Sequence, residues 1–196
     1  MIRTTIVALG LLLVGCSAPL SSPTSVPEVR QSVVSQPQVL ASPVAQGTPP
    51  TRISIPALDV DSEVLQVGMA DDITMEVPED ISMVGWFMHS ALPGADEGST
   101  VFVGHRDGRK DPNGVFRHLE QLDGGDLLVV WDASGQRRTY RVHSNELVSR
   151  TEFPQRAPDL FRLHGVQRVV LLTCGGSYDR AAGGYQANVV VTAHAL

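Results

Sequence analysis

The chain has 196 residues, of which 42% are hydrophobic and 18% are charged, and its formal net charge at pH 7 is −6. This length accommodates one domain of ordinary size and excludes two large ones. A negative net charge without a run of Lys or Arg argues against a basic binding surface, so nucleic acid is not an expected partner.

Residues 1–16 have the layout of a secretory signal, with Arg3 ahead of a short apolar stretch over Ile6–Val14. The segment Leu13-Val14-Gly15-Cys16 is similar to the bacterial lipobox, in which cleavage before the cysteine frees its thiol to receive a diacylglycerol. We therefore expect an exported protein lipidated at Cys16. An uncleaved hydrophobic anchor, or a plain signal with a coincidental cysteine, are the alternatives. Lipidation and an uncleaved anchor both predict attachment to the outer face of the cytoplasmic membrane.

Residues 17–50 are rich in Pro, Ser, Thr, Val, Gln and Ala. They lack the aromatic and periodic apolar residues whose burial would offset the entropy of ordering, so we expect a disordered linker. At about 3.1 Å per residue in a polyproline II conformation, such a linker reaches roughly 100 Å, which would lift a domain into a surrounding wall layer.

The predicted folded domain covers residues 51–196, and its signals are those of strands. Arg52–Pro56 alternates polar and apolar residues, and Val60–Val67 does so less regularly. The one clear helical candidate is short, Phe116–Leu122. Many short strands without crossover helices or a repeat favour an all-β, mainly antiparallel barrel or sandwich. Further strands rich in Val, Ile, Leu and Thr are predicted over residues 100–103, 127–131, 138–142, 168–173 and 188–192.

Cys174 ends the apolar run Val169–Thr173 and is followed at once by Gly175 and Gly176. If Cys16 carries a lipid, the mature chain has one cysteine and cannot form an intramolecular disulfide. An unpaired thiol in an exported protein is explained by a reactive site, by intermolecular pairing or by burial, and the residues alone leave these alternatives open. A reactive thiol must ionise near neutral pH, which requires a cation or hydrogen-bond donors beside it.

Histidine is the commonest partner of a catalytic thiol. His105 stands out because it ends the apolar run Val101–Gly104, much as Cys174 ends its own, and two such residues can meet at one rim of a sheet. A surface or core role is the alternative for every histidine. The predicted domain has six: His89, His105, His118, His143, His164 and His194.

Neither a metal nor a cofactor is expected, because no pair of Cys or His residues stands at ligand spacing. A metal-binding module is therefore a poor alternative. The acidic pairs Asp71-Asp72 and Glu79-Asp80 could bind calcium, but we interpret them as solvated surface charges.

Two long segments resemble the sortases, specifically those of class F: VGWFMHSALPGADEGSTVFVGHRDGRKDPNGVFRHLEQLDGGDLLVV and LLTCGGSYDRAAGGYQANVVV. A Gly-His followed by a Thr-Cys across a complete set of β segments is a specific signal, and the resemblance runs from about Arg52 to His194. The family's order and spacing are also matched by RISIPALDV, Gly85-Trp86, Pro93-Gly94, Gly104-His105, Gly114-Val115-Phe116 and Thr173-Cys174-Gly175-Gly176.

The resemblance implies an eight-stranded β-barrel with short helices and the activity of a cell-surface cysteine transpeptidase. Cys174 would attack the Thr–Gly carbonyl of an LPXTG-like sorting signal and hold the product as a thioester, which an amine, typically of a peptidoglycan precursor, then accepts. His105 would protonate the leaving amine and deprotonate the incoming one, and Thr173 would contact the substrate. The expected protein is a monomer with an extracellular catalytic domain, attached to the membrane by its N-terminus.

The sequence departs from the family at one position. The family has a catalytic arginine on the strand after the cysteine loop, and this chain has Gln186 there. Removing a preorganised donor from an oxyanion site commonly costs about 10²- to 10³-fold in rate. Gln186 could suffice for a slow enzyme, or Arg180 could swing in from the connecting loop, although ordinary surface charges also explain Arg180 and Arg106. Otherwise the protein has lost most activity and serves as a peptide- or wall-binding lipoprotein.

Overall fold

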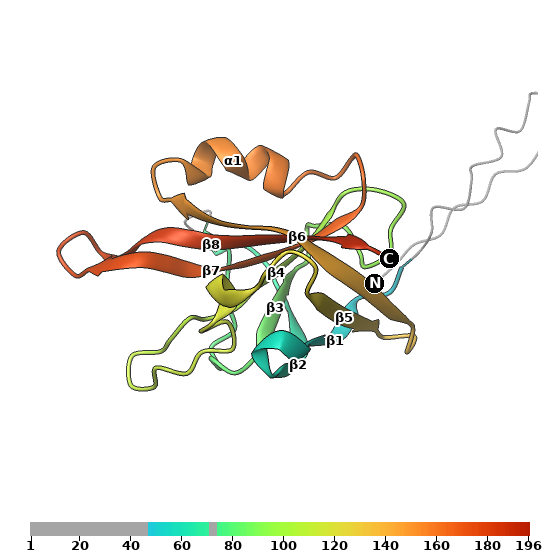
Figure 1. Ribbon diagram of the computed structural model, residues 1–196, viewed down its shortest axis with the longest axis horizontal. Helices are drawn as coiled ribbons and strands as arrows, with labels where there is room; N and C mark the ends of the chain where they lie inside the picture. Colours follow the sequence, from blue (N-terminus) through green and yellow to red (C-terminus); the bar gives the residue numbers. More distant parts are fainter. Residues whose placement is uncertain (1–46, 71–73) are drawn as a thin grey trace, which may run out of the picture. The chain divides into compact units, whose positions relative to one another are not determined.

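The computed structural model describes residues 47–70 and 74–196 (Figure 1). The predicted signal, the lipidation candidate Cys16, most of the predicted linker and the pair Asp71-Asp72 lie outside the described residues. The last linker position, Pro50, already begins the first strand. No helix in the described ranges is long and apolar enough to cross a membrane.

The described residues form a closed barrel in the order β1-β2-β3-β4-β7-β8-β6-β5. Two neighbouring pairs, β2–β3 and β4–β7, are parallel, and the remaining pairs are antiparallel. The predicted eight-stranded, mainly antiparallel barrel is therefore confirmed. The strands are β1 (Pro50–Ile55), β2 (Val60–Val67), β3 (Val84–Phe87), β4 (Ser99–Val103), β5 (Leu127–Asp132), β6 (Arg137–Ser149), β7 (Arg168–Asp179) and β8 (Gly184–Ala195).

The predicted short helix is present as a 3-10 helix, and the α-helix of the described residues lies elsewhere. Within residues 116–122 only a short 3-10 helix forms, η2 (Leu119–Gln121), and a second one, η1 (Pro56–Leu58), follows β1. The α-helix of the described chain is α1 (Phe153–Leu160). Its two prolines obscured the helical pattern, but a proline in the first turn removes no intrahelical hydrogen bond and is tolerated there.

Strand β7 separates two layers of apolar side chains. Val169 and Leu171 point into the barrel interior, whereas Val170 and Leu172 belong to a second buried cluster on the outer face. Because both faces of β7 are covered, the strand reads as a continuous apolar run rather than an alternating one. The outer cluster is completed by partly buried side chains from α1 and other segments: Met75, Val77, Phe153 and Phe161.

Beyond the barrel, β7 and β8 continue as a long hairpin, which projects to the left in Figure 1. Both strands are longer than predicted. The predicted ranges, 168–173 and 188–192, lie in the barrel part of β7 and β8. The glycine-rich, polar residues that follow Cys174 read as a loop in sequence. They pair instead, as in the contact of Tyr178 with Tyr185.

Candidate active site

The parallel pairing of β4 with β7 brings His105 and Cys174 to one rim of the barrel. Val103 is paired with Leu172, and each candidate residue follows its paired residue by two positions. Parallel strands run in the same direction, so both side chains emerge at the same end of the sheet. Both line a pocket of about 550 Å³.

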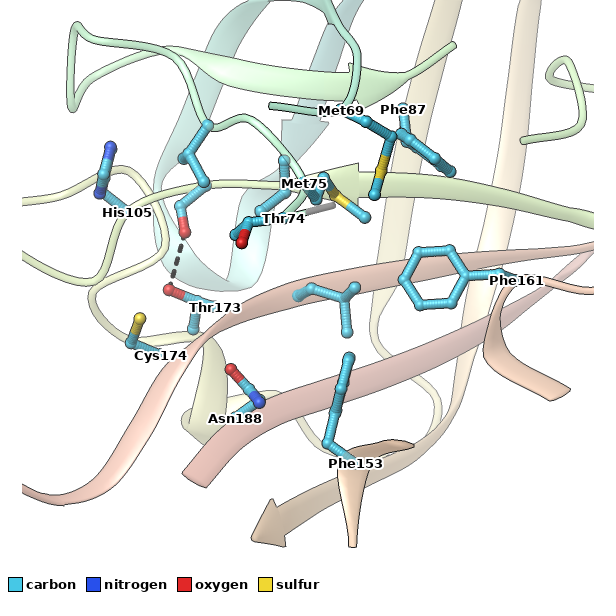
Figure 2. Close-up of a pocket in the computed structure, with 14 residues that line it drawn as sticks. Met69, Thr74, Met75, Phe87, His105, Phe153, Phe161, Thr173, Cys174 and Asn188 are labelled. Carbon is cyan, nitrogen blue, oxygen red and sulfur yellow. Dashed lines mark hydrogen bonds between the residues drawn. The ribbon is translucent and has the colours of Figure 1, made fainter. Parts of the chain in front are cut away.

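Figure 2 shows how the pocket is arranged, with His105 and Cys174 at one end and Phe87 and Phe161 at the other. Cys174 is a free, exposed cysteine, so it is not sealed in the core. Its side chain lies on the same face of β7 as Leu172, two residues earlier, which is the outer face packed against α1. The thiol is therefore open to a ligand lying in this pocket.

Thr173 holds the two strands together at the rim. Its side chain is buried, and its hydroxyl donates a hydrogen bond of 2.8 Å to the carbonyl of Gly104, the residue before His105 (dashed in Figure 2). The hydroxyl is thus engaged within the protein, and it positions the histidine loop relative to the cysteine strand.

The imidazole of His105 is held by a backbone carbonyl. Its Nε2 lies 2.9 Å from the oxygen of Pro78. A carbonyl oxygen can only accept, so Nε2 carries a hydrogen, and in the neutral ring Nδ1 has the free lone pair. The ring's hydrogen bond among the described residues goes to Pro78 rather than to Cys174.

The electrostatic environment of Cys174 differs from the expectation drawn from sequence. Burial against the surrounding protein and the nearby charge of Asp107 both raise the pKa of the thiol, while Arg106 and Arg150 oppose this shift. The direction of this shift is opposite to the one that lowers a thiol pKa towards neutral. The cause is that desolvation favours the neutral thiol and no imidazole hydrogen bond offsets it.

Gln186 and Arg180 are the two candidates to replace the family's arginine. Neither brings a positive charge to the thiol. Gln186 precedes Asn188 by two residues and so shares the face of Cys174, but its amide donates 2.6 Å to the carbonyl of Gly184. Arg180 is exposed in the turn of the projecting β7–β8 hairpin. The two arginines whose charges act on the thiol are Arg106, next to His105, and Arg150, which follows β6.

The rest of the pocket is mainly apolar, with Thr74 and Asn188 as its further polar residues. Phe161 makes edge-to-face contacts with Phe87, at 5.8 Å between ring centroids, and with Phe153, at 6.4 Å. An extended peptide with apolar side chains fits such a wall, because the hydrophobic effect favours burying them there. Sequence reasoning missed these lining residues, since they come from four separate segments: Met69, Met75, Val77, Phe87, Phe153 and Phe161.

The described residues contain no group of three or more His, Cys, Asp or Glu side chains placed to hold a metal ion. Asp80, one of the calcium candidates, accepts hydrogen bonds from the backbone and hydroxyl of Ser82, at 2.9 and 2.7 Å. These bonds lower the pKa of the Asp80 carboxyl and give it a role in the local turn.

The sequence of residues 53–196 matches the sortase domain family. Among solved structures, sortase C-1 from Actinomyces oris has a TM-score of 0.56 and 24% identity, covering 74% of this chain and 72% of that chain. Sortase C1 from Streptococcus agalactiae has a TM-score of 0.56 and 22% identity, with 74% and 66% covered. A lid mutant of sortase A from Corynebacterium diphtheriae has a TM-score of 0.55 and 20% identity, covering 74% of this chain and 68% of that chain. No curated protein sequence matches the chain significantly.

Proposed function

Because the chain belongs to the sortase family, we propose that it is a class F type cysteine transpeptidase that cleaves an LPXTG-like sorting signal at its Thr–Gly bond. One observation carries this proposal: the β4–β7 register places His105 and the exposed thiol of Cys174 at one end of a single apolar pocket. A nucleophile, a proton carrier and a wall for apolar side chains are the parts that acyl transfer from a peptide requires.

In the first step the thiol of Cys174 gives its proton to Nδ1 of His105, the sulfur bonds to the threonine carbonyl carbon, and the bond from that carbon to the glycine nitrogen breaks. His105 gives a proton to the departing amine, which leaves a thioester on the enzyme. In the second step an amine attacks the thioester, His105 takes its proton, and the sulfur departs. Since Nε2 is bound by Pro78, Nδ1 is the ring atom available to exchange the proton. Such proton transfer contributes typically about 10²- to 10⁴-fold in rate.

We also propose that the protein is exported and anchored at the outer face of the cytoplasmic membrane through lipidated Cys16, with residues 17–50 as the tether. The layout of residues 1–16 supports this assignment. The acceptor amine then comes from a peptidoglycan precursor or another surface amine within the reach of the tether. Labelling with a radioactive or alkyne-tagged fatty acid should modify the wild type and fail to modify Cys16→Ala.

The test of the reaction is incubation of the purified protein with LPXTG-like peptides, followed by mass spectrometry of the intact chain. We expect a thioester adduct on Cys174 and release of the fragment that begins with glycine. Cys174→Ala and His105→Ala should each abolish cleavage, and Gln186→Arg should increase it. Cleavage that survives Cys174→Ala unchanged would remove the thiol mechanism.

A second function is favoured by one observation, the neutral amide of Gln186 and its engagement with Gly184. In this alternative the protein retains the sortase fold as a weak or inactive peptide- or wall-binding lipoprotein. It predicts that the wild type binds sorting-signal peptides without forming an adduct, and that Gln186→Arg restores the adduct.

A further inference from the structure

The proposed reaction places negative charge near Cys174 twice, on the sulfur as a thiolate and on the carbonyl oxygen during attack. Fixed positive charge or hydrogen-bond donors are needed to stabilise both. Burial and Asp107 both raise the pKa of the thiol, and the charges that oppose them are those of Arg106 and Arg150. The amide of Gln186 carries no charge and already donates to Gly184. Among the groups that act on the thiol, the cation must therefore be Arg106 or Arg150.

The pairing of three strands defines which residues share the face of the thiol. Cys174 on β7 is paired with Asn188 on β8, and Asn188 is in turn paired with Val148 on β6. Paired residues point to the same side of a sheet, and so do residues two positions apart in a strand. Arg150 follows Val148 by two positions, so it lies on the face of Cys174.

The backbone of Arg150 continues this register past the last residue of β6. Its N–H donates a hydrogen bond of 3.0 Å to the carbonyl of Gln186. Arg150 thus stands directly beside the position where the resemblance implies an arginine, but on the neighbouring strand. The two positions are paired neighbours although they are 36 residues apart (186 − 150) in the chain.

Arg150 is also the less committed of the two arginines that act on the thiol. Arg106 forms two hydrogen bonds with the carboxylate of Glu120, at 2.9 and 3.1 Å, and its guanidinium lies 5.7 Å from the ring centroid of Tyr185. Arg150 donates 3.0 Å to the neutral carbonyl of Ala182, and within the described residues it has no carboxylate partner. Its charge is uncompensated, and most of its five N–H donors are available.

We propose that Arg150 supplies the positive charge missing at Gln186: its guanidinium turns from Ala182 towards Cys174 and stabilises the thiolate and the oxyanion of the substrate. This inference rests on the proposed function, since it assigns a residue to that reaction. The side chain gives up one neutral carbonyl contact and gains charge-assisted hydrogen bonds, which are roughly twice as strong as neutral ones. An arginine suits this role because its planar fork presents several donors at once.

The test compares Arg150→Ala, Arg150→Lys and a matched control, Arg141→Ala, an exposed arginine near the other end of β6. One readout is the rate of thioester formation with an LPXTG-like peptide. The other is the rate of Cys174 alkylation by a methanethiosulfonate as a function of pH, which needs no peptide. Melting temperatures of all variants establish that they are folded.

We expect Arg150→Ala to slow thioester formation by about 10²-fold and to move the alkylation profile to higher pH, because the thiolate loses a stabilising charge. Arg150→Lys keeps the charge, so it should keep the wild-type alkylation profile while losing part of the acylation rate. The charges of Asp107 and Arg106 are unchanged in every variant and cannot produce a difference between them.

If Arg150→Ala matches Arg141→Ala in both readouts, the inference is overturned while the proposed function stands. If the wild type forms no adduct with any peptide, the transpeptidase proposal fails. The alkylation profile then still decides whether Arg150 acts on the thiol: a shift supports the pairing and an unchanged profile removes it.

Discussion

Gly114 offers a direct way to disturb the histidine loop without touching a catalytic side chain. Its N–H donates 3.1 Å to the carbonyl of Arg106, and a Cβ at this position would lie 2.3 Å from the oxygen of His105 and 2.6 Å from the carbonyl carbon of Arg106. These are backbone atoms, so no change of rotamer relieves the clash. Restoring van der Waals separation moves the His105 backbone by about 1 Å, and a misplacement of that size costs on the order of 10²-fold in rate.

Gly114→Ala should therefore lower kcat/KM for a sorting-signal peptide by about 10²-fold, with a loss of stability of about 1–3 kcal/mol from overpacking. The matched control is Gly124→Ala, because a Cβ there meets only the carbonyl oxygen of His143, at 3.9 Å. Activity is measured well below the melting temperature of each variant, so that unfolding does not contribute. Equal kcat/KM values for the two variants would refute the argument that this close approach positions His105.

Two further predictions concern charged groups. Asp107→Asn removes a charge that raises the pKa of Cys174, so alkylation should begin at lower pH than in the wild type, and an unmoved profile would contradict this assignment. Burial raises the pKa of Asp132, but hydrogen bonds from Ser134 and Arg138 outweigh it and bring the pKa to about 2. The stabilisation by Asp132 is complete above its ordinary pKa of 3.8 and is lost as the pH falls towards 2. Asp132→Ala should lower the free energy of unfolding by about 2 kcal/mol at neutral pH. When this free energy is measured by urea denaturation, it should change less with pH below pH 4 in the variant than in the wild type. Parallel curves of free energy against pH would contradict this account.

The barrel could be predicted because most of its strands are buried on at least one face. The run from Val169 to Leu172 is apolar throughout because β7 is covered by the interior on one side and by the α1 layer on the other. The hairpin beyond Cys174 has no such covering. Its residues are exposed and glycine-rich, so hydrophobic periodicity carries no signal that the strands continue.

Within the site, the positions of His105 and Cys174 were accessible from sequence because each follows an apolar run of residues. Their meeting depends on the parallel register of Val103 with Leu172, which is formed across a long stretch of intervening chain. The hydrogen bond from His105 to Pro78 could not be predicted, since it joins a ring to a backbone carbonyl from another segment. Apolar spacing contains no information about such contacts.

The charge balance at the thiol was the least accessible property, because it is set by which elements pack around the rim. Asp107 and Arg106 come from the histidine loop, while Arg150 comes from the end of β6, where its backbone is paired with Gln186. By sequence position alone, residue 186 lacks the arginine that the resemblance implies. Electrostatic stabilisation depends on distance and direction rather than on the strand that carries the charge. A chain of this family can therefore lose the arginine from one strand and keep a cation at the same place, provided that the adjacent strand presents it on the same face.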